Sequence, residues 1–266
     1  MSDSKLEMAK HIWGLGDYSI VGEWFSSASV RCLDGLDLAG KRLLDVACGT
    51  GNVSIEAARR GASVTALDLT PSMLSEAMRR ASAAGVEIDF VEGSFTDLSS
   101  FSGFDVVTSA FGVIFSSDQA QTARELTNTV AVGGRVHVAA WNPDGAFGTF
   151  HPELMELLPG MDEGPPTGRW ATEKGISEIF DGLDVRPLEP IRGRVIMPFE
   201  SLDHVLDQFF THSGPWVFIA DVVAKQGQTP RLRSLLEKTL SPFLSSSEEG
   251  VELAVDYTVS RLERVG

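Results

Sequence analysis

The sequence predicts an α/β protein built on a mostly parallel sheet, and three observations carry that prediction. The apolar run at 43–47 is typical of a strand buried on both faces of such a sheet, and a glycine-rich turn follows it. A helical stretch comes next, and then a second apolar run that ends at Asp68. Further apolar runs at 86–91 and 104–110 alternate with helical segments.

Composition allows one domain and excludes several classes of function. The chain has 266 residues, 43% of them hydrophobic, which is enough for one α/β core with a cap. Its net charge of −15 would repel a nucleic acid, so we expect none as partner. No run is long and apolar enough for a membrane span, and the N-terminus lacks the pattern of a secretory signal. We therefore expect a cytoplasmic protein, in agreement with only two cysteines and no zinc-like spacing.

A glycine-rich turn follows residue 47. Gly49 and Gly51 let the backbone bend and approach a ligand without a side chain between them. Strand, glycine turn, helix, strand and acid together predict a nucleotide-binding half-site. Asp68 is placed to accept hydrogen bonds from two ribose hydroxyls.

Asp45 indicates which nucleotide the site holds. A dinucleotide would bring a pyrophosphate to the turn, and a carboxylate four positions before Gly49 would repel it. Ser54 also stands where the dinucleotide pattern has its third small residue. An acid at position 45 suits a ligand with positive charge, such as the ammonium and sulfonium of S-adenosylmethionine.

The stretches DVACGTG and ALD resemble motif I and the acidic motif of the class I S-adenosylmethionine-dependent methyltransferases. The resemblance covers about 13–141 and is closest to the small-molecule branch with the ubiquinone and menaquinone biosynthesis methyltransferases. It implies a Rossmann-like sheet of seven strands, the last one antiparallel, with helices on both faces. It also implies S-adenosylmethionine as cofactor and S-adenosylhomocysteine as product. The C-terminal part resembles this branch only loosely.

The same resemblance implies a set of cofactor contacts. Aromatic residues of the N-terminal segment cover the methionine end, and residues just after Asp68 flank the adenine. The family usually carries an acid for the adenine amino group where this chain has Ser94, so Glu92 or Asp97 are alternatives. The cofactor-binding residues that we expect are Trp13, Tyr18, Asp45, Ala47, Gly49, Gly51, Asp68, Leu69, Met73, Gly93, Ser94, Phe95, Ser109 and Phe111.

The remaining elements complete one domain that spans residues 1–266. Residues 1–40 form an N-terminal helical cover, 41–142 the cofactor-binding core, and 143–266 a cap, edge strands and C-terminal helices. Thr70 and Pro71 start a helix that ends at Gly85, and His137 alternates with apolar neighbours in the fifth strand, as a packed histidine does. The Gly/Pro-rich stretch after the fifth strand predicts a lid over the pocket. Strands are expected at 192–199 and 255–262, with largely helical structure between them.

The chemistry predicted is methyl transfer to a small, apolar or aromatic molecule, through an oxygen or carbon nucleophile. A base is needed only where that nucleophile must lose a proton, and His212 and His151 are candidates for it. We expect no metal, and a homodimer is compatible with the sequence. Two alternatives remain open: a cyclase-like enzyme that keeps the cofactor without net methyl transfer, and an NAD-dependent reductase, which Asp45 and Ser54 disfavour.

Overall fold

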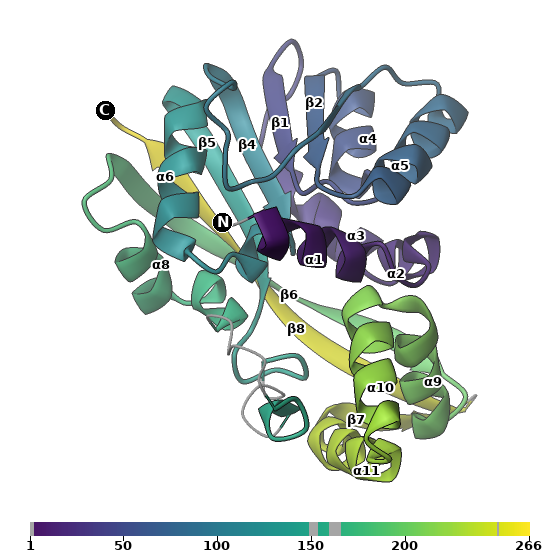
Figure 1. Cartoon of the computed structure of the whole chain (residues 1–266). Coiled ribbons are helices and arrows are strands. Elements are labelled where there is room, and N and C mark those ends of the chain that lie inside the picture. The colour runs from purple at the N-terminus through teal and green to yellow at the C-terminus, as the bar shows by residue number, and fades with distance from the viewer. Residues whose placement is uncertain (1–2, 149–153, 160–165, 249) are drawn as a thin grey trace.

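A computed structural model of the chain describes residues 3–148, 154–159, 166–248 and 250–266. At its centre lies a sheet with the strand order β3-β2-β1-β4-β5-β8-β6, and β7 pairs with β8 (Figure 1). The strands β1 to β5 run parallel to one another, and β8 is antiparallel to both β5 and β6. The strands are β1 Arg42–Val46, β2 Ser63–Asp68, β3 Asp89–Glu92, β4 Phe104–Ala110, β5 Val130–Trp141, β6 Val185–Phe199, β7 Leu244–Ser247 and β8 Gly250–Arg264.

Helices lie on both faces of this sheet, and others lie across the carboxyl ends of its parallel strands (Figure 1). One group precedes β1, a second connects the parallel strands, α8 lies between β5 and β6, and the last group lies between β6 and β7. The α-helices are α1 Asp3–Trp13, α2 Tyr18–Trp24, α3 Ser26–Ser29, α4 Asn52–Arg59, α5 Pro71–Ala84, α6 Gln119–Thr129, α8 Glu173–Ile179, α9 Leu202–His212, α10 Gly214–Lys225 and α11 Thr229–Leu240. Short 3₁₀ turns are η1 Val30–Leu33, η2 Val113–Phe115, η3 Thr167–Ala171 and η4 Ser241–Phe243. No helix in the described ranges is long and apolar enough to cross a membrane.

The Rossmann-like, mostly parallel sheet with an antiparallel last strand is confirmed, but the prediction of seven strands is wrong. The described residues form eight strands, because Leu244–Ser247 pairs with the start of β8. This segment reads LSSS and has too little apolar pattern to indicate a strand, so only its tertiary partner makes it one. The outer strands are also longer than expected: β6 begins at Val185 and β8 at Gly250.

The local signals of the parallel half are confirmed. Leu43, Leu44 and Val46 are fully buried, as expected for a strand covered on both faces. The helix α5 starts at Pro71 and ends against Gly85, whose φ of 67° is the left-handed conformation that favours glycine. Thr70 occupies the N-cap position, but its side chain makes no capping hydrogen bond.

His137 is the packed histidine that the alternating pattern predicts. The residue is 1% exposed, and Nδ1 of its ring lies 2.7 Å from the carbonyl oxygen of Cys32. Burial lowers the pKa of His137 to about 4, so the ring is neutral at physiological pH. It ties the N-terminal segment to β5.

The strands β6 and β8 extend beyond the parallel part of the sheet. Pairing of β5 with β8 stops at Trp141 and Tyr257, whereas pairing of β6 with β8 continues to Phe199 and Val251. Figure 1 shows that this projecting ribbon carries β7, α9, α10 and α11, which we call the cap. The cap thus lies beside the carboxyl ends of the parallel strands, where ligands bind in open α/β sheets.

The helices α1 and α2, which we call the cover, contact the cap, and two backbone N–H groups donate hydrogen bonds between them. The backbone N–H of Asp17 donates to the carbonyl of His212 over 2.9 Å, and the N–H of Gly214 donates to the hydroxyl of Tyr18 over 3.2 Å. Gly16, with φ of 76°, lies so close to His212 that a Cβ would be 2.1 Å from its carbonyl oxygen. Cover and cap therefore enclose the carboxyl edge of the sheet together.

Candidate active site

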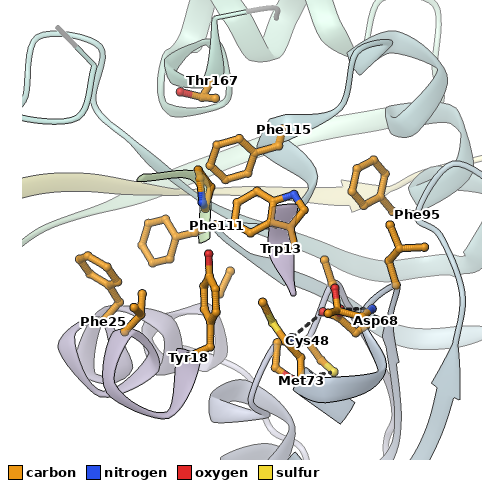
Figure 2. Close-up of a pocket in the computed structure, with 18 of the residues that line it drawn as sticks. Trp13, Tyr18, Phe25, Cys48, Asp68, Met73, Phe95, Phe111, Phe115 and Thr167 are labelled. Carbon is orange, nitrogen blue, oxygen red and sulfur yellow. Dashed lines mark hydrogen bonds between the residues drawn. The ribbon is translucent and has the colours of Figure 1, made fainter. Parts of the chain in front are cut away.

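A cavity of about 480 Å³ opens at the carboxyl ends of the parallel strands, between cover and cap. Its size is in the range usual for small-molecule sites. In Figure 2, Asp68 and Met73 lie on one side of it and Phe25 and Phe111 on the other. Both sides belong to one continuous space, so a ligand bound at the glycine turn can meet a second molecule on the aromatic side.

The turn after β1 is unusually dense in left-handed residues. Gly49 and Gly51 have φ of 54° and 84°, and Ala47 takes the same region with φ of 55°. For alanine this conformation costs about 1 kcal/mol. Gly112 gives Ala47 its room, because a Cβ on Gly112 would lie 2.4 Å from the Ala47 Cβ. The two residues follow neighbouring parallel strands and must fit each other.

This contact gives a direct test. Gly112→Ala is expected to destabilise the protein by about 2 kcal/mol and to abolish cofactor binding, because the new methyl group pushes the turn out of place. The measurement is a denaturant titration together with binding of S-adenosylhomocysteine by calorimetry. The double variant Ala47→Gly/Gly112→Ala removes the clashing Cβ and should recover most of both losses; no recovery would mean that the clash lies elsewhere.

Asp68 anchors the turn. Its Oδ2 accepts the N–H of Gly49 over 2.8 Å, and its Oδ1 accepts the N–H of Thr70 over 2.9 Å (Figure 2). Burial raises the pKa of this carboxyl, and the two backbone bonds oppose that rise. Each oxygen keeps a second lone pair that can accept a ligand hydroxyl.

Asp45 lies beneath the turn and is 1% exposed. Ser54 Oγ donates to its Oδ2 over 2.5 Å, and Thr108 Oγ1 donates to its Oδ1 over 2.9 Å. Burial raises the pKa of Asp45 to about 6. The serine that replaces the third glycine of a dinucleotide site is therefore a partner of this carboxylate. A cationic ligand near the turn would favour the charged form.

Leu69, Met73, Ser94 and Phe95, which the sequence predicts to lie beside the adenine, line the cavity. Ser94 Oγ also shares a hydrogen bond of 2.8 Å with Thr96 Oγ1. The two acidic alternatives lie off the cavity wall: Glu92 forms an ion pair with Lys10, and the Asp97 carboxylate accepts the hydroxyl of Ser99. Of the three residues considered for the adenine amino group, Ser94 alone lines the cavity.

The opposite side is aromatic. Phe111 stacks on Trp141 with ring centroids 3.7 Å apart, and Phe25 and Phe147 meet Trp141 at 4.8 and 5.2 Å. The cap adds Phe209, Trp216 and Ile219 to this wall. Titratable side chains among the described lining residues are confined to Tyr18, Asp45, Cys48 and Asp68. Burial raises the pKa of Tyr18 and of Cys48, so both are neutral near pH 7.

The structure brings nearly the whole predicted cofactor set to this cavity. Gly51 and Ser109 are the exceptions among the residues named above. Gly51 instead faces α5, where a Cβ would lie 3.2 Å from the Ala77 Cβ. Ser109 is buried, and its Oγ accepts the N–H of Val113 over 3.1 Å.

The two histidine candidates have different outcomes. His212 lies off the cavity wall with its ring edge-on to Trp24, at a centroid distance of 6.4 Å. His151 lies outside the described residues. Lining residues that the sequence pattern does not single out include Phe25, Thr96 and Phe115. None of them belongs to a motif, and only the fold brings them to the ligand edge.

The fold and the site define a nucleotide-binding α/β enzyme, and comparisons with known proteins give its family. Residues 43–134 match the family model described as a methyltransferase domain. An uncharacterised protein of Mycobacterium tuberculosis is 34% identical over 218 residues, which cover 77% of either chain. The demethylmenaquinone methyltransferase of Thermus thermophilus is 37% identical over 144 residues, 50% of this chain and 66% of that one.

Solved structures give the same result for the fold. A proposed methyltransferase from Bacillus halodurans superposes with a TM-score of 0.63 at 15% identity, over 90% of this chain and 100% of that one. The geranyl diphosphate C-methyltransferase of Streptomyces coelicolor, solved with S-adenosyl-L-homocysteine, gives 0.54 at 15% identity, over 90% and 79%. The chain belongs to the class I S-adenosylmethionine-dependent methyltransferases, and its cofactor is S-adenosylmethionine.

Proposed function

We propose that this methyltransferase acts on a small apolar or aromatic molecule through an oxygen or carbon nucleophile. The observation that supports this proposal is the asymmetry of the cavity. Its two carboxylates, Asp45 and Asp68, both lie at the glycine turn, whereas the far side is lined by aromatic rings. Apolar walls of this kind favour an apolar ligand, because burying it there leaves no charged group without a partner.

The residues at the turn have the chemistry that the cofactor requires. Asp68 offers its two carboxylate oxygens to the ribose hydroxyls, and Asp45 supplies negative charge next to the cationic end of the cofactor. Leu69, Met73 and Phe95 form an apolar slot for the adenine, and Ser94 offers it a hydroxyl. Trp13 and Tyr18 cover the opposite side from the N-terminal helices, with ring centroids 6.1 Å apart.

The cofactor, when bound, supplies an electrophilic methyl group on a sulfonium, and transfer leaves S-adenosylhomocysteine. What the chain contributes is alignment of the nucleophile and exclusion of water by the aromatic wall and the cover. No histidine among the described residues lies on the cavity wall, so alignment is the main contribution that the described residues make. His151 stays a predicted base.

The test is turnover with purified protein. Labelled S-adenosylmethionine is incubated with a panel of phenols, hydroxylated aromatics and activated carbon acids, and S-adenosylhomocysteine is measured by chromatography. Methyl incorporation restricted to amines or to strongly charged molecules would contradict the substrate class. Cofactor binding with product formation but without S-adenosylhomocysteine would favour the cyclase-like alternative. A cytoplasmic location and a homodimer also stay predictions from the sequence.

A further inference from the structure

One arginine of α5 contacts two segments of the site that are distant from it and from each other in the sequence: the glycine turn with the start of α4, and the helix α2. The Nη1 of Arg80 donates to the carbonyl of Thr50 over 2.8 Å, to its Oγ1 over 3.0 Å and to Asn52 Oδ1 over 2.8 Å. Its Nη2 donates to Glu23 Oε1 on α2 over 2.9 Å. A single guanidinium thus contacts the glycine turn, the start of α4 and the cover.

The helix α2 is also seated directly on the glycine turn. Asn52 Nδ2 donates to the carbonyl of Gly22 over 2.8 Å. A Cβ on Gly22 would lie 2.5 Å from Thr50 Oγ1, so no larger residue fits in this arrangement. Arg80 therefore donates to both residues, Thr50 and Asn52, that contact Gly22 of α2.

The position of α2 matters at both ends of the cavity. Tyr18 and Gly22 line it near the turn, and Phe25, directly after α2, belongs to the aromatic wall beside Trp141. A shift of α2 would therefore move a wall of the cofactor end and a wall of the substrate end together.

We propose that Arg80 is a positioning residue that locks the glycine turn to α2, so that one guanidinium sets the shape of both ends of the cavity. The proposal rests on the cofactor of the family and not on the substrate class proposed above. Arg80 itself does not line the cavity and acts through Thr50, Asn52 and α2.

The polar contacts of Arg80 differ in strength. The Arg80 side chain is 21% exposed and that of Glu23 is 64% exposed, so water screens the ion pair between them. The bonds to the Thr50 carbonyl and to Asn52 are only partly buried but are charge-assisted, and they dominate. A lysine at this position would keep the charge without the planar fork that reaches several acceptors at once.

Arg79 is a matched control on the same helix. Its guanidinium pairs with Glu76, one turn away, and its side chain is 68% exposed. Calorimetry should show S-adenosylhomocysteine binding about 10-fold weaker in Arg80→Met than in wild type, with Arg80→Lys in between. Arg79→Met should stay within about 2-fold. Equal affinities in Arg80→Met and Arg79→Met would overturn the proposal.

Hydrogen exchange separates positioning from a general loss of stability. In wild type, S-adenosylhomocysteine at saturation should slow amide exchange in residues 18–25, and in Arg80→Met this protection should be lost although the ligand is bound. Full protection in that variant would refute the coupling.

Gly22→Ala keeps Arg80 but pushes α2 away from Thr50, so it should weaken binding by a similar factor even if Arg80→Met does not fold. Wild-type affinity in Gly22→Ala would also refute the proposal. A wild-type protein that does not bind S-adenosylhomocysteine would contradict the assigned cofactor and not the role of Arg80.

Discussion

Asp68→Ala is expected to weaken binding of S-adenosylmethionine and S-adenosylhomocysteine about 10- to 100-fold. The carboxylate is the acceptor at the end of β2, and loss of a charged acceptor for two hydroxyls costs about 1.5–3 kcal/mol. The same change leaves the N–H groups of Gly49 and Thr70 without their acceptor. Part of the lost affinity therefore comes from a looser turn and part from the missing ribose contact, and both weaken binding.

The measurement is calorimetric titration of the folded variant, with its thermal unfolding recorded in parallel. Asp89→Ala is the matched control. Asp89 is exposed at the amino end of the neighbouring strand β3, whereas Asp68 lies at the carboxyl end of β2. It should bind as wild type does. Affinity in Asp68→Ala within a few-fold of wild type would show that the ribose contact has been assigned to the wrong residue.

Asp45→Asn is expected to make the free protein more stable at pH 7 and, at the same time, worse at binding. Folding raises the pKa of Asp45 from 3.8 to about 6, so the native state holds its proton more tightly than the unfolded chain does. The stability of the wild type therefore falls as pH rises from about 4 to 6 and stays low above that range. At about 1.4 kcal/mol per pKa unit, the cost at pH 7 reaches about 3 kcal/mol. Asparagine removes this cost.

Urea unfolding of the free protein at several pH values tests the expectation. The advantage of Asp45→Asn over wild type should be absent near pH 4 and largest at pH 7, whereas Asp89→Asn should follow the wild-type profile. An advantage that does not change with pH would mean that Asp45 is not held at a raised pKa. Binding of S-adenosylmethionine should weaken in the same variant, because the cationic cofactor loses the negative charge beneath the turn.

In this site the charge that favours cofactor binding lowers the stability of the free protein. Asp45 is a buried carboxylate whose charge is costly until a cation arrives, and Ser54 and Thr108 reduce that cost through their hydroxyls. A bound cationic cofactor should therefore stabilise the protein more at pH 7 than its binding contacts alone would.

Local chemistry is sufficient to predict the parallel half of the fold. The buried strand at 43–46, the glycine turn and the acid at Asp68 follow from apolar runs, from the backbone freedom of glycine and from the order of elements. The helix from Pro71 to Gly85 follows from its start and stop residues. Because each of these signals lies within a few neighbouring residues, the sequence carries them directly. Together with Asp45 they carry the family resemblance that implies the cofactor.

The other features depend on contacts between segments that are distant in the chain. The strand at Leu244–Ser247 exists because β8 offers it a partner, and the length of β6 and β8 is set by their mutual pairing. His212 adjoins a helix break, which favours a place near the pocket, but the fold turns its ring toward Trp24. Phe25 and Arg80 reach the aromatic wall and the glycine turn only through tertiary packing. Such contacts depend on how helices and strands pack, and no local pattern in the chain encodes them.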